Sequence, residues 1–421
     1  MTKKEVHYNI IDLLNKKTFY GCAGVKIGDC LYHRLKTDQE IGASISFFSA
    51  FKHLLKTLLF RCNKYDTEGD KSTLFLLTQS YICREEMREA FSRVVRLSSN
   101  RVVLYPGKKH FTLARFKYTA FFFTWFNQLR VIESVPLRLD CLSRIMDAFI
   151  LYMESESYFA RHKINIEYLL VLNDTQCTDS FFVQKYNYNK KCTISLQHGV
   201  FCSTYLSWAF TGSHSKYLLA NSQYTVDEGK KAGYKNRMII TGPFSYVGMD
   251  IKRKLPIKAV KKIGLFLDSV YDDDNVRAIK MISSCCKTSE KQLIIKLHPL
   301  NDCKLYEEIC EEGPITIVGT EKTVFDVFDM IDLAVVRYST VLIEALQYGI
   351  PSYIISDPEQ RLDVYNNAEF LKFSSVDEFT SLINKRVEDI MRDCEEGRLY
   401  FCGAEDITRR YEEAFQLIGI N

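Results

Sequence analysis

The sequence predicts an α/β protein made of two doubly wound domains, each a parallel sheet between layers of helices. Short apolar runs alternate with helical patterns throughout the second half of the chain, and polar residues such as Lys296–Pro299 follow the ends of these runs. This alternation is typical of repeated βαβ units. With 421 residues, the chain is long enough for two domains with a full hydrophobic core each.

The elements of the second half follow one another with few interruptions. Apolar runs predict strands, and amphipathic runs between them predict helices. The expected strands are residues 217–220, 238–241, 263–267, 293–297, 315–318, 332–336 and 352–355, and the expected helices are residues 225–232, 275–287, 323–329, 340–348, 376–394 and 407–418.

The first half has the same alternation, with strands expected at residues 72–77, 101–105, 166–173 and 193–196. Near its start, Gly24 and Gly28 are expected in a loop that borders a cleft or only makes a turn. Asp29 is expected to cap the helix that follows. We place the domain boundary after residue 212, which gives a first domain of residues 1–212 and a second of residues 213–402.

The composition is that of an ordinary globular protein, with 47% hydrophobic and 26% charged residues. A formal net charge of +4 is too small to indicate a nucleic-acid partner. Residues Ile41–Arg130, however, hold 15 Lys and Arg against 6 Asp and Glu, which predicts an anionic membrane surface or a charged acceptor as partner. The amphipathic stretch Ser46–Lys64 and the aromatic stretch Tyr118–Phe126 can rest on a bilayer or face the core, and we favour the core.

The 14 cysteines are scattered, without a Cys-x-x-Cys pair, and only Cys285 and Cys286 are adjacent. This spacing is not that of a zinc site, and no metal is expected. The first residues lack the apolar core of a signal peptide, and no run of 18 apolar residues is present. We therefore expect reduced thiols in a cytoplasmic protein, with contact to the inner face of the membrane as the alternative to a purely soluble one.

The stretch from Lys291 to Pro351 carries the densest set of candidate site residues. Its first strand ends in Lys296, His298 and Pro299, at the carboxyl end where open α/β sheets bind their ligands. Because His298 follows a strand and precedes the proline that stops it, we favour a functional histidine over a core histidine.

The strand at residues 332–336 repeats this arrangement, with Ser339 and Thr340 after its end. Either hydroxyl can cap the next helix, whose N–H groups and positive dipole end suit a phosphate, and an ordinary cap is an equal alternative. Glu344 lies on the first turns of that helix, where it accepts ribose hydroxyls or faces water. Together the two strand ends predict a seat for a diphosphate.

In the first half, Gln197, His198 and Gly199 follow an expected strand. A histidine freed by the following glycine can act as a general base toward an acceptor hydroxyl, and the alternative is a half-buried histidine at a turn. Asp174 follows the preceding strand and is expected beside this trio. The chain lacks the P-loop, the G-x-G-x-x-G fingerprint, the G-x-S-x-G elbow and the H-E-x-x-H motif, which argues against the enzyme classes that use them.

Taken together, the stretches SLQHG, NSQYTVDEGKKAGYKNRMIITGP, KLHP and YSTVLIEALQYGIP resemble bacterial GT-B glycosyltransferases of surface polysaccharide (capsule and O-antigen) biosynthesis. They are most similar to the group of Kdo-type capsule transferases, polysialyltransferases and CDP-glycerol transferases. The early GVKIGDCLYHRL also looks like the opening of surface-carbohydrate transferases. The resemblance runs from about Gly24 to Pro351 and is continuous only in the second half.

The resemblance implies two Rossmann-like domains facing a central cleft, with residues 403–421 forming a helix that crosses back to the first domain. The first domain is expected to bind the acceptor, and the second to bind the nucleotide-activated donor. By motif match, the donor nucleotide and its phosphates are held by Lys296, His298, Pro299, Gly242, Ser339, Thr340 and Glu344. Arg337 stands where relatives often carry a small or acidic residue, and it adds a phosphate contact while leaving the donor open.

On the acceptor side or in the cleft, the expected residues are Gln197, His198, Gly199, Asp174, Gly28 and Asp29. His198 matches a histidine proposed as base or phosphate contact in related transferases, and His298 is the second expected catalytic residue. No metal or other cofactor is expected, because helix dipoles and His or Lys side chains stabilise the departing phosphate.

We therefore expect a glycosyltransferase of the EC 2.4 type, inverting and metal-independent. It would move a sugar from a nucleotide-activated donor to a growing capsule, O-antigen or lipopolysaccharide acceptor, with no nucleic acid involved. The alternatives are a CDP-glycerol or CDP-ribitol polyol-phosphate transferase, a nucleotide-sugar 2-epimerase, and a non-catalytic scaffold of the same shape. The donor, the acceptor, the linkage and the oligomeric state stay open.

Overall fold

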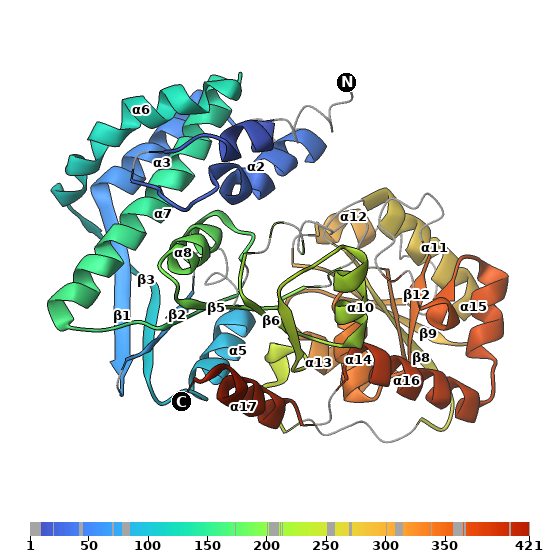
Figure 1. The fold of residues 1–421 in the computed structure, drawn as a ribbon. Helices are drawn as coiled ribbons and strands as arrows, with labels where there is room; N and C mark the ends of the chain where they lie inside the picture. Colours follow the sequence, from blue (N-terminus) through green and yellow to red (C-terminus); the bar gives the residue numbers. More distant parts are fainter. Residues whose placement is uncertain are drawn as a thin grey trace.

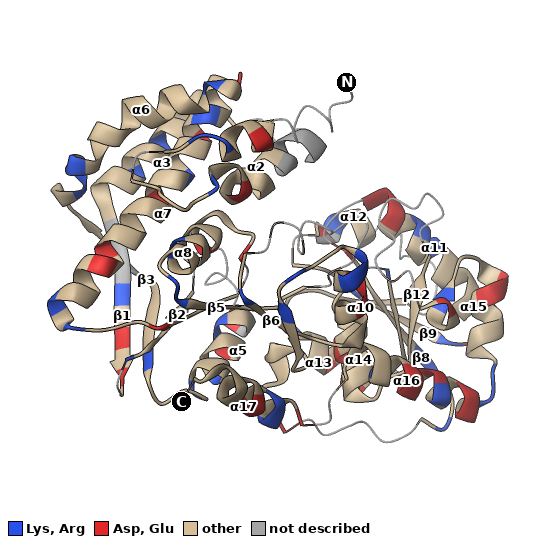
Figure 2. Cartoon of the chain, viewed as in Figure 1, with Lys and Arg blue, Asp and Glu red and all other residues tan. Residues whose placement is uncertain are grey.

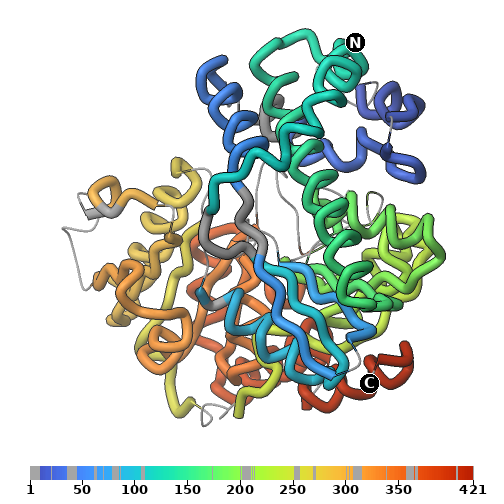
Figure 3. The backbone as a smooth tube through the Cα atoms, turned by 90° about the vertical axis from the view of Figure 1, so that its left-hand side faces the viewer, coloured from blue at the N-terminus to red at the C-terminus, as the bar shows by residue number. Residues whose placement is uncertain are grey.

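The computed structural model contains two α/β sheets, one from each half of the chain, with helices packed around them (Figure 1). A group of helices from the first 162 residues stands apart from the second sheet, and Figure 3 shows the same arrangement after a quarter turn. The structure describes residues 10–19, 21–41, 45–69, 71–77, 85–172, 174–199, 201, 210, 212, 214–250, 257–268, 272–299, 301–307, 315–337, 339–356, 365, 368–403 and 406–420.

The first sheet has seven strands in the order β1-β3-β2-β4-β5-β6-β7. These strands are β1 (Phe60–Glu68), β2 (Thr73–Leu76), β3 (Arg101–Phe111), β4 (Tyr168–Val171), β5 (Cys192–Leu196), β6 (Tyr217–Ala220) and β7 (Arg237–Ile240). β1 is antiparallel to β3, and every other neighbouring pair is parallel. The strand order therefore reverses between β2 and β4, as in a doubly wound sheet.

Both faces of this sheet are buried, because alternate residues of each strand enter different cores. Leu74 and Leu76 of β2 pack into the core under the helices of the first half, whereas Phe75 and Leu77 pack into the core on the opposite face. The helical elements of this half are α2 (Ile27–Ile41), α3 (Phe47–Leu59), α5 (Glu85–Val95), η1 (Ala114–Thr119), α6 (Ala120–Gln128), η2 (Leu129–Val131), α7 (Val135–His162) and α8 (Cys177–Tyr188).

Three expectations for the first half are wrong in detail. The stretch Ser46–Lys64, favoured as core-facing, forms α3 up to Leu59 and then enters β1, and only one side of α3 packs on the core, since Phe47, Phe48, Phe51 and Leu55 are exposed. The strand expected to end at Pro106 continues to Phe111, and the proline lies beside a β-bulge, where a missing N–H is tolerated.

The third correction concerns Gly28 and Asp29, which were expected before a helix. α2 already begins at Ile27, so Asp29 lies in its first turn and is not its N-cap. A Cβ at Gly28 would lie 2.3 Å from the carbonyl oxygen of Ile11. Glycine is therefore required here by the close approach of two backbone segments.

The second sheet has six parallel strands in the order β10-β9-β8-β11-β12-β13. The strands are β8 (Lys262–Phe266), β9 (Gln292–Lys296), β10 (Ile315–Val318), β11 (Leu333–Val336), β12 (Ser352–Ile355) and β13 (Lys372–Phe373). The helices between them are α11 (Asp272–Thr288), α12 (Cys303–Glu307), α13 (Val324–Met330) and α14 (Val341–Tyr348), followed by the turn η4 (Glu369–Leu371). In chain order this is the 3-2-1-4-5-6 arrangement of dinucleotide-binding sheets. The predicted fold class is confirmed.

The division of the chain between the sheets differs from the boundary expected after residue 212. β6 and β7 pair with β5 and with each other, and they flank α10 (Gln223–Lys231). Residues up to about Thr241 therefore complete the first sheet, and η3 (Phe244–Tyr246) leads away from it. The alternating pattern of strands and helices is the same on both sides of the boundary, so only strand pairing decides to which sheet a unit belongs.

The chain ends in three helices. The single helix expected over Val376–Cys394 is two helices, α15 (Val376–Ile383) and α16 (Val387–Phe401), with a break at Asn384. α17 (Ile407–Ile418) lies beside α5 (Figure 1), and its Phe415 ring is 6.5 Å from the ring of Phe75 in β2. The last helix therefore packs on the first sheet.

Candidate functional site

The strand order of the second sheet reverses between β8 and β11, and ligands of such sheets bind outside the carboxyl ends at this switch point. Asp268 follows β8 and Arg337 follows β11. Because these two strands pair in parallel, both residues lie at the same edge of the sheet. Both side chains are buried, at 5% and 7% exposure. The switch point thus carries a buried carboxyl group, that of Asp268, and a buried guanidinium, that of Arg337.

Arg337 is held by an ion pair to α11. Its guanidinium donates to Asp274 Oδ2 at 2.9 Å, and Arg277 pairs with the other oxygen of the same carboxylate. Burial alone would raise the pKa of Asp274, but the hydrogen bonds and charges of the two arginines outweigh it and keep the pKa below its ordinary value. Asp274 is therefore ionised and fixes Arg337 at the edge of the sheet.

Asp268 has a different environment. Burial, opposed by Arg337 and helped by the charge of Asp274, raises the pKa of Asp268 to about 7. Its Oδ2 is fully buried and has no hydrogen-bond partner among the described residues. An acid with this pKa is present in both protonation states at neutral pH, so it can donate a hydrogen bond to an anion or accept one from a hydroxyl.

The backbone around Asp268 is fixed by two asparagines. Asn275 of α11 donates to the carbonyl oxygen of Asp268 at 3.0 Å, and Asn301 donates to the same oxygen at 2.9 Å. Asn301 also accepts the N–H of His298 at 2.8 Å. The ends of β8 and β9 are thereby linked, and His298 is half-buried next to an exposed Pro299.

Lys296 lies at the end of β9 and is 7% exposed. Its ammonium group donates to the carbonyl oxygens of Gly319 at 2.6 Å and Leu297 at 3.2 Å. The side chain therefore bridges the ends of β9 and β10, and its charge lies at the same edge of the sheet as Arg337.

Ser339 and Thr340 lie at the start of α14. Ser339 Oγ accepts the N–H of Val341 at 3.3 Å, while Thr340 is the N-cap residue and makes no side-chain capping hydrogen bond. Tyr365 donates to the carbonyl oxygen of Ser339 at 2.8 Å. The N-terminus of α14 is thus fixed at the switch point. Glu344 lies one turn further on, where its carbonyl oxygen accepts a hydrogen bond from Tyr246 at 2.7 Å.

Gly242 contacts the last helix, α17. It adopts a φ of 86°, and a Cβ at this position would lie 2.8 Å from Cγ1 of Ile407. Tyr411 donates to the carbonyl oxygen of Gly242 at 3.3 Å. Its immediate contacts in the structure are therefore with α17.

The predicted residues of the first domain form two separate networks. In the first, Gln197 is 1% exposed and bridges backbone groups, since it donates to Gly199 O and accepts the N–H of Asn221, both at 2.7 Å. His198 is half-buried, with its ring 6.3 Å from that of Phe201. A Cβ at Gly199 would meet no atom of the described residues within 4 Å, its two chain neighbours left aside.

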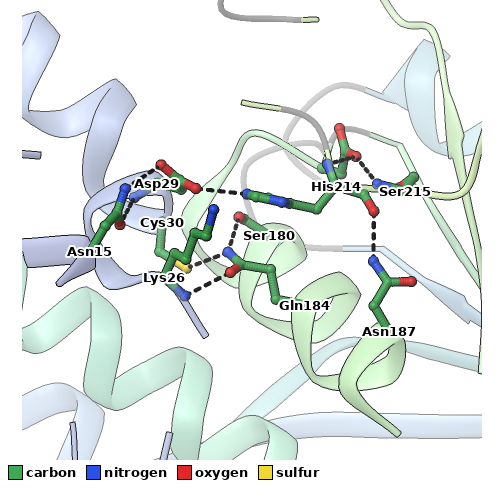
Figure 4. A network of polar contacts seen from close by, with 10 residues as sticks. Asn15, Lys26, Asp29, Cys30, Ser180, Gln184, Asn187, His214 and Ser215 are labelled. Carbon is green, nitrogen blue, oxygen red and sulfur yellow. Dashed lines mark hydrogen bonds and ion pairs between the residues drawn. The ribbon is translucent and has the colours of Figure 1, made fainter. Parts of the chain in front are cut away.

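The second network joins α2, α8 and the segment before β6 (Figure 4). The carboxylate of Asp29 accepts a hydrogen bond from the Asn15 amide at 2.8 Å, and its other oxygen lies 2.8 Å from His214 Nε2. The carboxylate of Asp174 accepts the backbone N–H groups of His214 and Ser215, at 2.9 and 2.8 Å. Asp29 and Asp174 therefore meet at His214.

Sequence reasoning missed three members of these clusters: Asp268, Asp274 and His214. Asp268 follows the expected strand 263–267 and was open to the same strand-end argument that selected His298. Asp274 and His214 gave no comparable signal, because each is defined by a partner far away in the sequence, Arg337 and Asp29 respectively.

The described residues include no group of three or more His, Cys, Asp or Glu side chains placed to hold a metal ion. The cysteines whose side chains the structure describes are free thiols: Cys22, Cys30, Cys141, Cys177, Cys192, Cys285, Cys286, Cys394 and Cys402. Within the described part of the chain, no helix has the length and apolar character needed to cross a bilayer.

No protein-family profile matches the chain, and no curated protein matches its sequence. Solved structures do match its fold. MnaA of S. aureus, in a co-structure with UDP, aligns with a TM-score of 0.53 and 11% identity over 83% of this chain and 98% of that chain. The UDP-GlcNAc 2-epimerase of Neisseria meningitidis, bound to UDP-GlcNAc, aligns with a TM-score of 0.50 and 12% identity over 82% and 98%.

The lipopolysaccharide outer core galactosyltransferase WaaB also aligns, with a TM-score of 0.47 and 12% identity over 82% of this chain and 98% of that chain. At these identities the matches to MnaA and to the epimerase of Neisseria meningitidis show the fold alone. The protein has the GT-B architecture, with two Rossmann-like domains in one chain.

Proposed function

We propose that the protein is a glycosyltransferase that moves a sugar from a nucleotide-activated donor to a glycan or glycolipid acceptor. The observation that carries this proposal is the charged cluster at the switch point of the 3-2-1-4-5-6 sheet, where Arg337, Asp268 and the start of α14 meet. Nucleotides bind at this position in sheets of this order.

In this proposal the donor diphosphate lies against the N-terminus of α14, with Ser339 and Thr340 as hydroxyl and N–H donors. Arg337 supplies a fixed positive charge, and His298 contacts the phosphates from β9. Protonated Asp268 donates a hydrogen bond to a phosphate oxygen. Lys296 contributes its charge from the same edge, and Pro299 and Gly242 shape the surroundings.

The transfer step forms a bond between the acceptor oxygen and the anomeric carbon, and it breaks the bond from that carbon to the phosphate oxygen. The nucleoside diphosphate leaves with the electron pair of the broken bond. His198, half-buried after the end of β5, takes the proton of the acceptor hydroxyl, and attack from the face opposite the leaving group inverts the anomeric carbon. The positive groups of the second domain stabilise the leaving phosphate.

The remaining parts of the proposal concern the ribose contact and the first nucleotide to test. In this proposal Glu344, on the first turns of α14, meets the ribose of a nucleotide whose phosphates lie at the start of that helix. UDP is the first donor nucleotide to test, because it occupies the MnaA structure, which has the same fold.

Thermal stability with a panel of nucleotides tests the donor site without knowledge of the acceptor. CMP, CDP, UDP, GDP, ADP and dTDP are compared at 1 mM, and a nucleotide that binds only the folded state raises Tm. We expect one nucleotide to raise the Tm of the wild type and to leave the Tm of the Arg337→Met variant unchanged. A panel in which no nucleotide shifts the wild type would overturn the donor site.

His198→Ala separates the proposed base from the donor site. We expect this variant to retain the nucleotide-induced rise in Tm and to lose transfer to acceptor glycans. Loss of both properties would contradict the role of base, because His198 would then belong to nucleotide binding.

A nucleotide-sugar 2-epimerase is the second candidate, and the structural match to the epimerase of Neisseria meningitidis favours it. An epimerase needs no acceptor, so incubation with UDP-GlcNAc alone, followed by proton NMR, distinguishes the two functions. Formation of the C2 epimer without an acceptor would establish the epimerase.

A further inference from the structure

The first domain carries exposed apolar side chains on α3, at the end of β3, on η1 and on α6, and we call this set the aromatic face. Its side chains are between 38% and 85% exposed, with Phe48 at 85% and Phe123 at 75%. The members of the aromatic face are Phe47, Phe48, Phe51, Leu55, Phe111, Leu113, Phe116 and Phe123. Every exposed phenylalanine in the described part of the chain belongs to this face.

The elements that carry the aromatic face are neighbours in the fold, because hydrogen bonds join them. Thr112 donates its N–H to the carbonyl oxygen of Leu59 at 2.8 Å, which ties the end of β3 to the end of α3. Arg115 of η1 donates to the carbonyl oxygen of Thr57 at 2.9 Å. α6 continues directly from η1, so Phe123 follows on the same group of elements.

The exposed apolar residues of α3 lie on a different side of the helix from its buried residues. Its buried residues are Ala50, Leu54, Thr57 and Leu58. On the exposed side, Phe47, Phe51 and Leu55 form one ridge at four-residue spacing, and Phe48, Lys52 and Lys56 form the next. A helix that faces only water on this side would carry polar residues there.

The charged residues of the segments that carry the aromatic face are Lys and Arg (Figure 2). Residues 47–65 and 101–132 contain no Asp or Glu, and they contain ten Lys and Arg. The lysines at positions 52, 56 and 117 are exposed among the aromatic side chains. A combination of exposed Phe and Leu with Lys and no acid matches the interface of a bilayer that contains anionic lipids.

We propose that the aromatic face docks the protein on an anionic lipid bilayer. The phenylalanines enter the boundary between headgroups and acyl chains, and the lysines meet the lipid phosphates. The face lies on the helices of the first domain that stand apart from the second sheet, so the nucleotide site is left accessible to the aqueous phase (Figures 1 and 3). This inference is independent of the proposed function, although a lipid-linked acceptor would be brought to the first domain by such docking.

Sedimentation with vesicles tests the proposal without nucleotide or acceptor. Vesicles of phosphatidylcholine with 30% phosphatidylglycerol are compared with vesicles of phosphatidylcholine alone at 0.1 M salt. We expect the wild type to bind the anionic vesicles at least ~10-fold more tightly than the neutral ones. A double variant Lys52→Glu/Lys56→Glu should lose at least ~25-fold, since each lysine near the surface contributes about fivefold.

The apolar part of the face is tested by Phe48→Ser/Phe123→Ser, which should also abolish sedimentation. Both side chains are exposed, so the variant should fold as the wild type does. The matched control is Leu399→Ser/Leu417→Ser, which removes two leucines of 60% and 56% exposure outside the face and should bind like the wild type.

Failure of the wild type to bind anionic vesicles would overturn the proposal, as would equal binding by the face variants and the control. Light scattering across protein concentrations identifies the competing occupant. A dimer that the Phe48→Ser/Phe123→Ser variant abolishes, together with no vesicle binding, would assign the face to a second copy of the chain instead.

Discussion

The two sheets share a doubly wound topology but use the polar residues after their strands differently. In the second sheet, Asp268 and Arg337 lie at the switch point, and the buried oxygen of Asp268 meets no described hydrogen-bond partner. After the strands of the first sheet, side-chain oxygens of Asp174 and Gln197 accept hydrogen bonds from backbone N–H groups of their own domain. The residues after the strands thus differ: those of the second sheet include a buried carboxyl oxygen without a described hydrogen-bond partner, whereas those of the first sheet bind backbone groups of their own domain.

This difference shows that a polar residue after a strand is not sufficient evidence of a binding site. A side chain whose hydrogen bonds are all made within the fold has little left to offer a ligand, whereas a buried carboxyl group without a partner costs stability. Groups that lower the stability of the fold in this way are found more often at functional sites than elsewhere.

The largest expected effect comes from Arg337→Met, which leaves Asp274 with one fewer charge partner and removes the positive charge beside Asp268. Removal of one partner from a buried ion pair costs about 3–5 kcal/mol of the free energy of unfolding. Urea denaturation measures this loss. If the second domain holds the nucleotide site, the nucleotide-induced rise in Tm disappears as well.

Arg115→Met is the matched control in the first domain, because Arg115 is 3% exposed and forms a two-pronged pair with Glu154 at 2.8 Å. A loss of stability of the same size is expected, with the nucleotide effect intact. If both variants lost the nucleotide effect equally, the contrast between the domains would not hold.

The next effect concerns Asp268, whose folded-state pKa is raised to about 7. The folded protein binds this proton more strongly than the unfolded chain does, so the group favours folding at low pH. This stability is lost as the pH rises from about 4 through 7. Between pH 5 and 8 the loss amounts to about 2–3 kcal/mol.

Asp268→Asn cannot ionise, so its free energy of unfolding should lack this component. The difference between variant and wild type, measured by urea denaturation at pH 5, 6, 7 and 8, should increase up to pH 7 and then level off. A constant difference across this range would show that Asp268 does not titrate near neutrality.

Much of the fold could be predicted from the sequence, because the apolar runs of parallel strands are buried on both faces and are easily recognised. The strands at residues 315–318 and 352–355 and the helix at residues 407–418 have the predicted bounds. β1 was missed because its sequence, FRCNKYDTE, lacks a sustained apolar run and only one of its faces is covered by the first core.

The candidate site was predictable only in part. His298 and Ser339 were selected because they follow strands, which is a property of local sequence. The partners that give the site its charge pattern are set by tertiary contacts, such as that between Arg337 and Asp274, 63 residues apart. Whether a strand-end residue is engaged by its own domain, as Gln197 is, also depends on contacts that no local pattern reveals.

A third prediction tests the structural role of Asp174. Asp174→Ala removes the acceptor of two backbone N–H groups, at His214 and Ser215, and should lower the free energy of unfolding by about 2 kcal/mol. The nucleotide-induced rise in Tm should be unchanged, since the tie lies within the first domain. Asp174→Asn, which keeps one acceptor oxygen, should cost less. A loss of nucleotide binding in Asp174→Ala would show that the first domain shares the donor site.

The smallest expected effect is the difference in stability between two glycine variants, and it tests the packing of α17 on the first domain. Gly242 and Gly233 both have positive φ, 86° and 73°, but a Cβ would clash with Ile407 only at Gly242. Gly233→Ala therefore measures the backbone cost alone, about 1–2 kcal/mol, and Gly242→Ala should cost about 1–2 kcal/mol more because of the overpacking. In an Ile407→Ala background the two substitutions should cost the same, because the clashing atom is gone. If the extra cost persists there, the close approach of α17 is not what requires glycine at 242, and a direct role of this residue beside the donor becomes the better explanation.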